Sequence, residues 1–349
     1  GLGRQVTIEG FQGALSSRAT FSKLTIADDD GVWITINDGA IGWNRTALLS
    51  GRVEVEELSA AEIDLPRAPH GSGGPVEFTA FSLPELPVSI SVGSLSTERL
   101  VLGADLLGQK AVVRIAASGQ LSGGEGSADF SLKRIDGKEG ELTLKAAFAN
   151  STRIATIDLL ASEGPGGVAA TKLGLPGTPS ARLALHGSGP TDNFVTDLAL
   201  ATDGTPRLTG TMKITAAPSD AEGPKDRHFL AHLEGDIAPL LQPQHREFFG
   251  SAVTLDAEGV SRVDGRTDLT RLVLDSDGLD LSGRLSLSPD KIPMAAAFTA
   301  RFGVVGKTEM LLPIPGEPTF VQNGTLLLRY DAAKGNGWTL TGDLEGFRR

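Results

Sequence analysis

Apolar and polar residues alternate through most of the chain, in short runs separated by turn signals. The alternation is clearest over residues 18–65, where Val32-Trp33-Ile34-Thr35-Ile36 lies between turn signals at 28–31 and 37–39. Successive side chains of a strand point to opposite faces, and Asp-Gly between two such runs is a strong hairpin signal. Residues 18–65 are therefore predicted to form a β-meander with one apolar face.

Similar runs recur roughly every ten residues, with turns between them. Beyond residue 65 they occupy 86–92, 100–103, 111–117, 128–134, 141–148, 152–160, 181–186, 193–200, 207–215, 229–234, 252–257, 267–274, 279–288, 295–302, 324–330 and 338–344. The chain lacks the strand–helix alternation that predicts a parallel sheet, so the pattern indicates an all-antiparallel protein. The best helix candidate is 236–249, and Pro239 or Pro243 limits it to about three turns.

Composition bears on how these strands pack. The chain has 44 Gly and 19 Pro but only 5% aromatic residues. A closed sandwich would bury a core rich in large side chains. The composition speaks against such a core, and the alternative is an all-β fold made of one elongated, curved antiparallel sheet. Its apolar concave face would be left uncovered by protein, and at most one or two short helices would be present.

The domain organisation follows from the same repetition. We expect one continuous repeating β-groove fragment over residues 1–349, with internal breaks at 66–76, 163–180 and 217–226, where Gly, Pro and polar residues gather. The alternating strand pattern is present from the first residues after Gly1, and no evident signal ends it at Arg349. The sequence is therefore interpreted as a fragment of a longer chain.

Shared parity within each strand identifies the residues expected to line the groove. They are Val6, Ile8, Leu24, Ile26, Ile34, Ile36, Val53, Val55, Ile90, Val92, Val113, Ile115, Leu142, Leu144, Leu198, Leu200, Leu272, Leu274, Leu285, Leu287, Leu326 and Leu328. Leu, Val, Ile and Ala dominate this face, and Thr, Ser and charged residues dominate the other.

Charge and residue content exclude several classes of protein. The formal net charge is −11, and the basic residues are scattered, whereas a nucleic-acid binder needs clustered Lys and Arg. There is no cysteine, and no apolar stretch approaches the ~20 residues needed to cross a bilayer. We expect no nucleic-acid partner, no cofactor and no enzyme activity.

Three local patterns suggest chemistry but are incomplete. The segment 275–280 begins like a calcium loop and lacks the remaining ligands, so a hairpin turn explains it. His228 and His232 would share a face of a helix and could bind zinc, but their surroundings read as extended. Gly187-Ser188-Gly189 lacks the full nucleophile elbow. We therefore predict no catalytic residue and no metal site, and we assign Trp33 and Trp43 to packing.

Several short motifs, taken in order, resemble a known family. They are Ile8-Glu9-Gly10-Phe11-Gln12-Gly13, Leu24-Thr25-Ile26, Asp30-Gly31-Val32-Trp33, Ile41-Gly42-Trp43, Leu48-Leu49-Ser50-Gly51, Leu58-Ser59-Ala60-Ala61-Glu62-Ile63 and Arg67-Ala68-Pro69. Their order and spacing resemble the amino-terminal region of the TamB family, the inner-membrane subunits of the translocation and assembly module of Gram-negative bacteria, within the AsmA-like group. Asp236-Ile237-Ala238-Pro239-Leu240-Leu241 with Phe248-Phe249-Gly250 resembles alphaproteobacterial members.

This resemblance implies a location, partners and a role. Members of the family are anchored in the inner membrane by one helix, cross the periplasm as a β-structure with a hydrophobic groove, and contact the outer-membrane barrel protein TamA through a carboxy-terminal domain. Neither the anchor nor that domain is recognisable here. Members are thought to carry phospholipid to the outer membrane and to aid assembly of some outer-membrane proteins. The resemblance also implies a long, taco-like β-structure (a β-taco), similar in architecture to the bridge-like lipid-transfer proteins of eukaryotes.

We therefore expect a periplasmic bridge segment that holds phospholipid acyl chains in its groove. Burying each methylene is worth roughly 0.8 kcal/mol, so acyl chains need no polar site to be held. The alternative is a scaffold or chaperone that offers sheet edges to unfolded outer-membrane strands or to secreted autotransporters.

Overall fold

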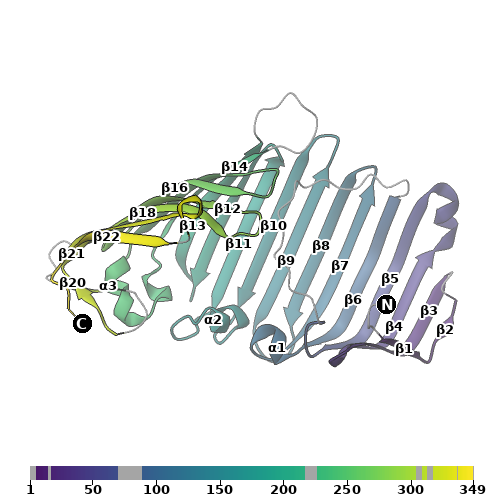
Figure 1. Cartoon of the computed structure of the whole chain (residues 1–349). Helices are drawn as coiled ribbons and strands as arrows, with labels where there is room; N and C mark the ends of the chain where they lie inside the picture. Colours follow the sequence, from purple (N-terminus) through teal and green to yellow (C-terminus); the bar gives the residue numbers. More distant parts are fainter. Residues whose placement is uncertain are drawn as a thin grey trace. The chain divides into compact units, whose positions relative to one another are not determined.

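The computed structural model describes residues 5–14, 17–69, 89–216, 226–303, 309–312, 317–335 and 337–348. Most of these residues lie in β-strands (Figure 1). Twenty strands belong to one open sheet, and two short strands form a second. The prediction of an all-β fold built on a curved, mostly antiparallel open sheet is confirmed.

The chain divides into two compact units. Unit 1 comprises residues 1–174 and 178–186, and unit 2 comprises residues 175–177 and 187–349. One of the predicted breaks, 163–180, adjoins this division. Most of the other two predicted breaks, 66–76 and 217–226, lies outside the described residues.

Unit 1 consists almost entirely of strands joined by tight turns. Its strands are β1 (Gln5–Glu9), β2 (Gln12–Gly13), β3 (Arg18–Asp28), β4 (Gly31–Asn44), β5 (Arg52–Leu65), β6 (Ser89–Leu102), β7 (Ala111–Ser122), β8 (Glu125–Arg134), β9 (Gly140–Ala149), β10 (Ile154–Glu163) and the first part of β11 (Ala181–Pro190). Its helical turns are η1 (Arg45–Ser50), α1 (Ala104–Leu107) and α2 (Val168–Lys172). Both α1 and α2 lie at the same end of the strands (Figure 1), where Lys172 Nζ donates to the Leu106 carbonyl at 3.0 Å.

One pairing in unit 1 corrects the all-antiparallel prediction. β5 and β6 run parallel, with Ile63 opposite Leu100. Parallel neighbours need a connection of about a dozen or more residues, and the sequence between Leu65 and Ser89 is long enough for one. The last part of the predicted meander, residues 52–65, forms the single strand β5, which a register shift between Val55 and Glu57 interrupts without ending.

Unit 2 repeats the meander. After the remainder of β11 its strands are β12 (Asn193–Thr202), β13 (Thr205–Ala216), β14 (Arg227–Gly235), β15 (Val253–Ser261), β16 (Thr267–Asp275), β17 (Leu279–Leu287), β18 (Pro293–Gly303), β21 (Asn323–Asp331) and β22 (Trp338–Glu345). From β12 onward each pairs antiparallel with the next named. The separate hairpin of β19 (Met310–Leu311) and β20 (Phe320–Val321) lies between β18 and β21 in sequence.

The helix expected at 236–249 is wrong in its extent. The segment forms three single turns: η2 (Ala238–Leu240), η3 (Pro243–His245) and α3 (Arg246–Phe249). Pro239 and Pro243 each sit in the first turn of a 3₁₀ piece. A proline can begin a helical turn but cannot donate to the preceding one, so two prolines four residues apart divide the segment. η4 (Ala332–Lys334) is a further 3₁₀ turn. The described residues contain three short α-helices, α1, α2 and α3, where at most two were predicted.

Candidate apolar binding face

The strand registers bring apolar side chains of unit 1 onto one face. Residues paired across a ladder have side chains on the same side of the sheet. One row of paired residues crosses eight strands, from β3 to β10: Ala19, Ile41, Leu58, Leu95, Ala117, Phe130, Leu144 and Leu159. A second row crosses β1 and β3 to β7: Ile8, Leu24, Ile36, Ile63, Leu100 and Val113. These rows define the apolar face of unit 1.

The opposite face of unit 1 is polar. Lys23, Asn37, Glu62 and Arg99 form one row across β3 to β6, where Arg99 Nε donates to Glu62 at 2.8 Å. Ser118, Asp129, Lys145 and Asp158 form another across β7 to β10. The alternation in sequence therefore becomes a single sheet layer with one apolar and one polar side.

Irregularities in the ladder keep the apolar residues on the same face where strict alternation fails. In β5, Val55 pairs with Val92 and Leu58 pairs with Leu95, although residues 55 and 58 are separated by an odd number of positions. The residues between these two pairs are not paired. A β-bulge adds one extra residue to a strand, so the apolar side is lined by odd-numbered residues before the bulge and by even-numbered residues directly after it. Reading parity alone would have placed Leu58 on the polar face.

Unit 2 presents a comparable apolar face. One row crosses β12 to β18, β21 and β22: Leu198, Gly210, Leu233, Leu255, Leu274, Leu281, Ala300, Leu326 and Gly342. Another row on the same face, two rows along the strands, is Phe194, Ile214, Phe229, Gly259, Leu269, Leu285, Ala296, Tyr330 and Trp338. Tyr330 and Trp338 stack at its end, with ring centroids 4.6 Å apart.

The glycines on this face accommodate aromatic rings from neighbouring strands. A Cβ on Gly259 would meet the ring of Phe229, and a Cβ on Gly283 would meet the ring of Phe298. In unit 1, Phe21 covers Gly39 in the same way. Each ring therefore lies over the glycine of the neighbouring strand. The ring covers the glycine backbone, and the apolar face stays smooth at that point. Sequence reasoning missed these pairs, which are visible only once the register is known.

The registers place every predicted groove-lining residue on the apolar face of its own unit. Val6 and Ile26 pair beside the Ile8–Leu24 pair, for example, and Leu326 and Leu328 belong to adjacent rows in unit 2. Contact of these residues with lipid stays a prediction.

Most of the apolar face is not covered by protein within either unit. In the described residues each strand packs against its ladder neighbours, and no second sheet lies across the face. Strongly exposed members include Val6 at 56%, Ile8 at 50% and Leu340 at 61%. A sandwich would have buried these side chains, so each unit is a single-layer sheet.

One end of the unit 2 face is an exception, because α3 and the β19–β20 hairpin pack on it. Phe248 and Val321 are 1% and 0% exposed and form a small core with Met310 and Leu312. Leu279, Phe302 and Leu344, at one end of their strands, pack against this core. We call this group the end cap. The Phe248-Phe249 doublet in an aromatic-poor chain was the available signal for it.

In unit 1 a buried ion pair lies at the end of an apolar row. The register places Arg134 next to Val113, and its side chain is only 5% exposed. Its Nη2 and Nε donate to Asp136 at 2.7 and 3.1 Å, and the Val112 amide donates to the same carboxylate. The guanidinium bond is the largest of the effects that lower the pKa of Asp136 to about 2, against the smaller opposing effect of burial.

The residues of the three local patterns that suggested chemistry all lie in strands or in a hairpin turn. The segment 275–280 is the hairpin turn joining β16 and β17, as predicted. His228 and His232 both lie in β14, where four residues span about 13 Å of extended chain, so they are too far apart to share one ion. In the described ranges no group of three or more His, Cys, Asp or Glu side chains could hold a metal. Gly187, Ser188 and Gly189 are part of β11.

His232 instead makes an ion pair on the polar face of unit 2. Its Nδ1 lies 2.8 Å from Asp256 on β15, and Glu234 is 3.9 Å from its other ring nitrogen. The Asp256 hydrogen bond and the two carboxylate charges raise the pKa of His232. Sequence reasoning assigned no partner to His232, because the register that brings Asp256 opposite it is not visible in the sequence.

Comparison with known proteins does not identify the chain: no family model, curated protein or solved structure matches it. Within the part of the chain that the structure describes, no helix is both long and apolar enough to cross a membrane.

Proposed function

We propose that this chain is a bridge segment that holds phospholipid acyl chains against its apolar face while they move between membranes. The observation that supports the proposal is the set of apolar rows crossing each unit, uncovered by protein along most of their length and backed by a polar face. A core would need a second layer to be buried, so this surface suits an apolar ligand that arrives from outside.

The energetics favour retention without a fixed site. Burial of apolar area is worth about 25 cal/mol per Å², or about 0.8 kcal/mol per methylene, so two acyl chains are held firmly by contact alone. Laterally, Leu144 lies between Phe130 and Leu159, and neighbouring positions offer similar surfaces. Because no position binds a methylene much better than the next, the chains can slide.

The resemblance to the TamB family supplies the proposed setting. In that setting the segment lies in the periplasm of a Gram-negative bacterium, anchored in the inner membrane, and reaches TamA through a region beyond residues 1–349. The net charge of −11 also suits a protein whose polar side must not bind the anionic membrane surface nonspecifically.

The test is a pair of substitutions at adjacent residues on opposite faces of β9. Leu144→Asp places a carboxylate in the middle of an apolar row, and Thr143→Asp places the same charge on the polar side. We expect native mass spectrometry and lipid extraction to find phospholipid on the wild type and on Thr143→Asp, and little on Leu144→Asp. Ile115→Asp, on a neighbouring row, should behave like Leu144→Asp.

Thermal unfolding serves as the control for this test. Water reaches an uncovered face, so Leu144→Asp should stay folded, whereas an unpaired carboxylate in a sealed core costs several kcal/mol. A variant that unfolds outright, or one that keeps its lipid, contradicts the proposal.

A second candidate function is supported by the edge strand β22. In the described residues β22 pairs only with β21, and its Trp338 and Leu340 are 53% and 61% exposed. An unpaired strand edge can accept a strand from an unfolded outer-membrane protein. A photo-crosslinker at Thr341 and another at Leu144 separate the two roles. Polypeptide crosslinks at Thr341 without lipid crosslinks at Leu144 would favour the chaperone.

A further inference from the structure

Two arginines on the polar face of unit 2 flank a single alanine. Arg284 on β17 pairs with Ala297 on β18, and Ala297 pairs with Arg329 on β21. The two backbones are therefore two strand spacings, about 10 Å, apart. Because the side chain of Ala297 is only a methyl group, both guanidiniums can reach the space above it.

This space is a hollow in the surface of unit 2. A hollow of about 990 Å³ is lined by Arg284, Arg329 and residues of β16, β17, β18, β21 and β22. A second hollow of about 220 Å³ beside it shares Arg284, Ala297 and Arg329 and adds the hydroxyl residues Ser282 and Thr299. The two arginines are therefore at the junction of two concavities lined by hydrogen-bonding groups.

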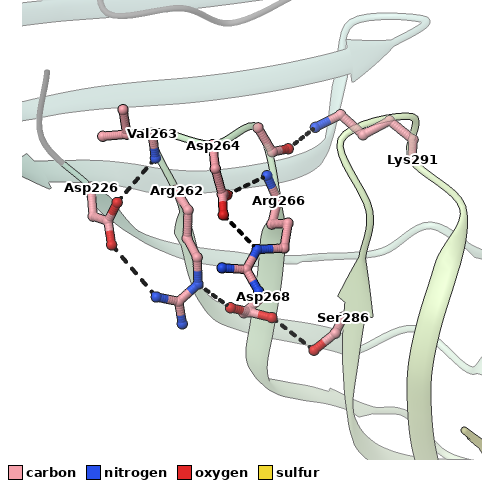
Figure 2. Close-up of polar contacts among 9 residues, drawn as sticks. Asp226, Arg262, Val263, Asp264, Arg266, Asp268, Ser286 and Lys291 are labelled. Carbon is pink, nitrogen blue, oxygen red and sulfur yellow. Dashed lines mark hydrogen bonds and ion pairs between the residues drawn. The ribbon is translucent and has the colours of Figure 1, made fainter. Parts of the chain in front are cut away.

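The carboxylates that line the larger hollow are already neutralised. Asp268 accepts from Arg262 Nε at 2.6 Å and from Ser286 Oγ at 2.7 Å, as Figure 2 shows. The other guanidinium arm of Arg262 faces Asp226 at 3.6 Å (Figure 2). Asp331 is 3.4 Å from Lys334.

Arg284 and Arg329 remain as uncompensated positive charge. Neither forms an ion pair or hydrogen bond with another of the described residues, and both are exposed. The neighbouring Arg262 and Arg266 each pair with an aspartate, whereas Arg284 and Arg329 do not. Two such guanidiniums facing one hollow are unusual in a chain of net charge −11. The planar guanidinium fork matches the oxygens of a phosphate group.

We propose that Arg284 and Arg329 form a binding site for a phosphate group on the polar face of unit 2. Two guanidiniums can each donate paired hydrogen bonds to the phosphate oxygens, and the hydroxyls of Ser282 and Thr299 lie in the adjoining hollow. The site is on the opposite side of the sheet from the apolar face, so it does not depend on the proposed acyl-chain binding. The phosphate can belong to a soluble phosphate ester or to a lipid headgroup at a membrane surface.

The experiment measures binding of two probes to the full chain. Calorimetry with inorganic phosphate tests a soluble source, and co-sedimentation with phosphatidylglycerol vesicles, against phosphatidylcholine vesicles, tests a headgroup. Arg284→Gln and Arg329→Gln should each weaken binding on the order of 10-fold, and the double variant should abolish it. Arg182→Gln, an exposed arginine on β11 in unit 1, makes the same charge change away from the hollow and should leave binding unchanged.

The outcomes distinguish a soluble phosphate from a lipid headgroup, and they test this proposal separately from the proposed acyl-chain binding. Binding of inorganic phosphate assigns a soluble ligand, and binding to phosphatidylglycerol vesicles alone assigns a headgroup. The proposal is overturned if the wild type binds neither probe, or if Arg182→Gln weakens binding as much as the double variant. Phospholipid retention on the apolar face, measured on the same variants, should not change, so the two proposals fail independently.

Discussion

At the scale of single residues, polar groups mark the places where the apolar rows end. Arg134 continues the row of Val113, yet its guanidinium is held by Asp136 and shielded from solvent. A buried charge is tolerated only when it is paired and hydrogen-bonded. Asp136 pairs with the guanidinium, accepts from its Nε and Nη2, and also accepts from the Val112 amide, while the buried Nη1 has no hydrogen-bond partner among the described residues. This pair therefore stabilises the end of β8 rather than offering an open site.

The Asp136 carboxylate gives unit 1 a predictable acid sensitivity. Its folded pKa of about 2 lies below the ordinary 3.8, so its contribution to stability is fully present above the unfolded value and is lost as pH falls through about 2. We expect Asp136→Asn to lower the free energy of unfolding by about 2 kcal/mol at neutral pH and by only about a few tenths of a kcal/mol at pH 2, where the folded carboxyl is half protonated. Urea unfolding at pH 7 and pH 2 measures both values.

The control for this prediction is Asp129→Asn, a carboxylate on the exposed polar row of β8. It should change stability by only a few tenths of a kcal/mol at either pH. Equal costs for the two variants at pH 7 would contradict the role assigned to Asp136.

At the scale of elements, the strands are held in register by features that alternation does not encode. Bulges in β5 and β6 return Val55 and Leu58 to the same side, and rings lie over glycines on the apolar face. Each device compensates for the absence of a second layer, because a single sheet has only cross-strand contacts to specify its register.

The Gly283–Phe298 contact tests this interpretation. Gly283→Ala places a Cβ against the Phe298 ring and the Ala297 carbonyl, so the ring must leave its position. We expect unit 2 to lose about 1–3 kcal/mol of stability, as overpacking usually costs. Gly42→Ala in β4, where only the Glu57 Cβ lies within 4 Å, should be nearly neutral. Denaturant unfolding of both variants measures these two changes in stability. A Gly283→Ala variant as stable as the wild type would contradict the role assigned to the Gly283–Phe298 contact.

At the scale of the whole molecule, the apolar face decides how the protein responds to its surroundings. Exposed Leu, Val and Ile rows on a folded protein should bind an apolar dye such as anilinonaphthalene sulfonate without any loss of secondary structure. Phospholipid should displace the dye, and it should raise the midpoint of thermal unfolding because it binds the folded state. Dye binding that persists in saturating phospholipid would show that lipid does not occupy the face.

The sequence by itself determined most of the strands and which of their residues share the apolar side, although the turn predicted at 37–39 lies inside β4 and the runs predicted at 86–92 and 100–103 both overlap the single strand β6. Alternation with period two and turns such as 275–280 are local, so residues such as Leu142 and Leu144 could be assigned to one side before the strand order was known. The position of 236–249 outside the ladder was also readable, because Pro239 and Pro243 favour the first turn of a helix over the interior of a central strand.

Only the tertiary structure decided which residues face each other. The parallel β5–β6 pair, the His232–Asp256 contact, the end cap around Phe248 and the Arg284–Ala297–Arg329 row each join residues distant in sequence. Their geometry depends on register and strand order, which long-range pairing sets and local pattern does not. Local chemistry determines which way a side chain points, and the sheet as a whole determines what lies beside it.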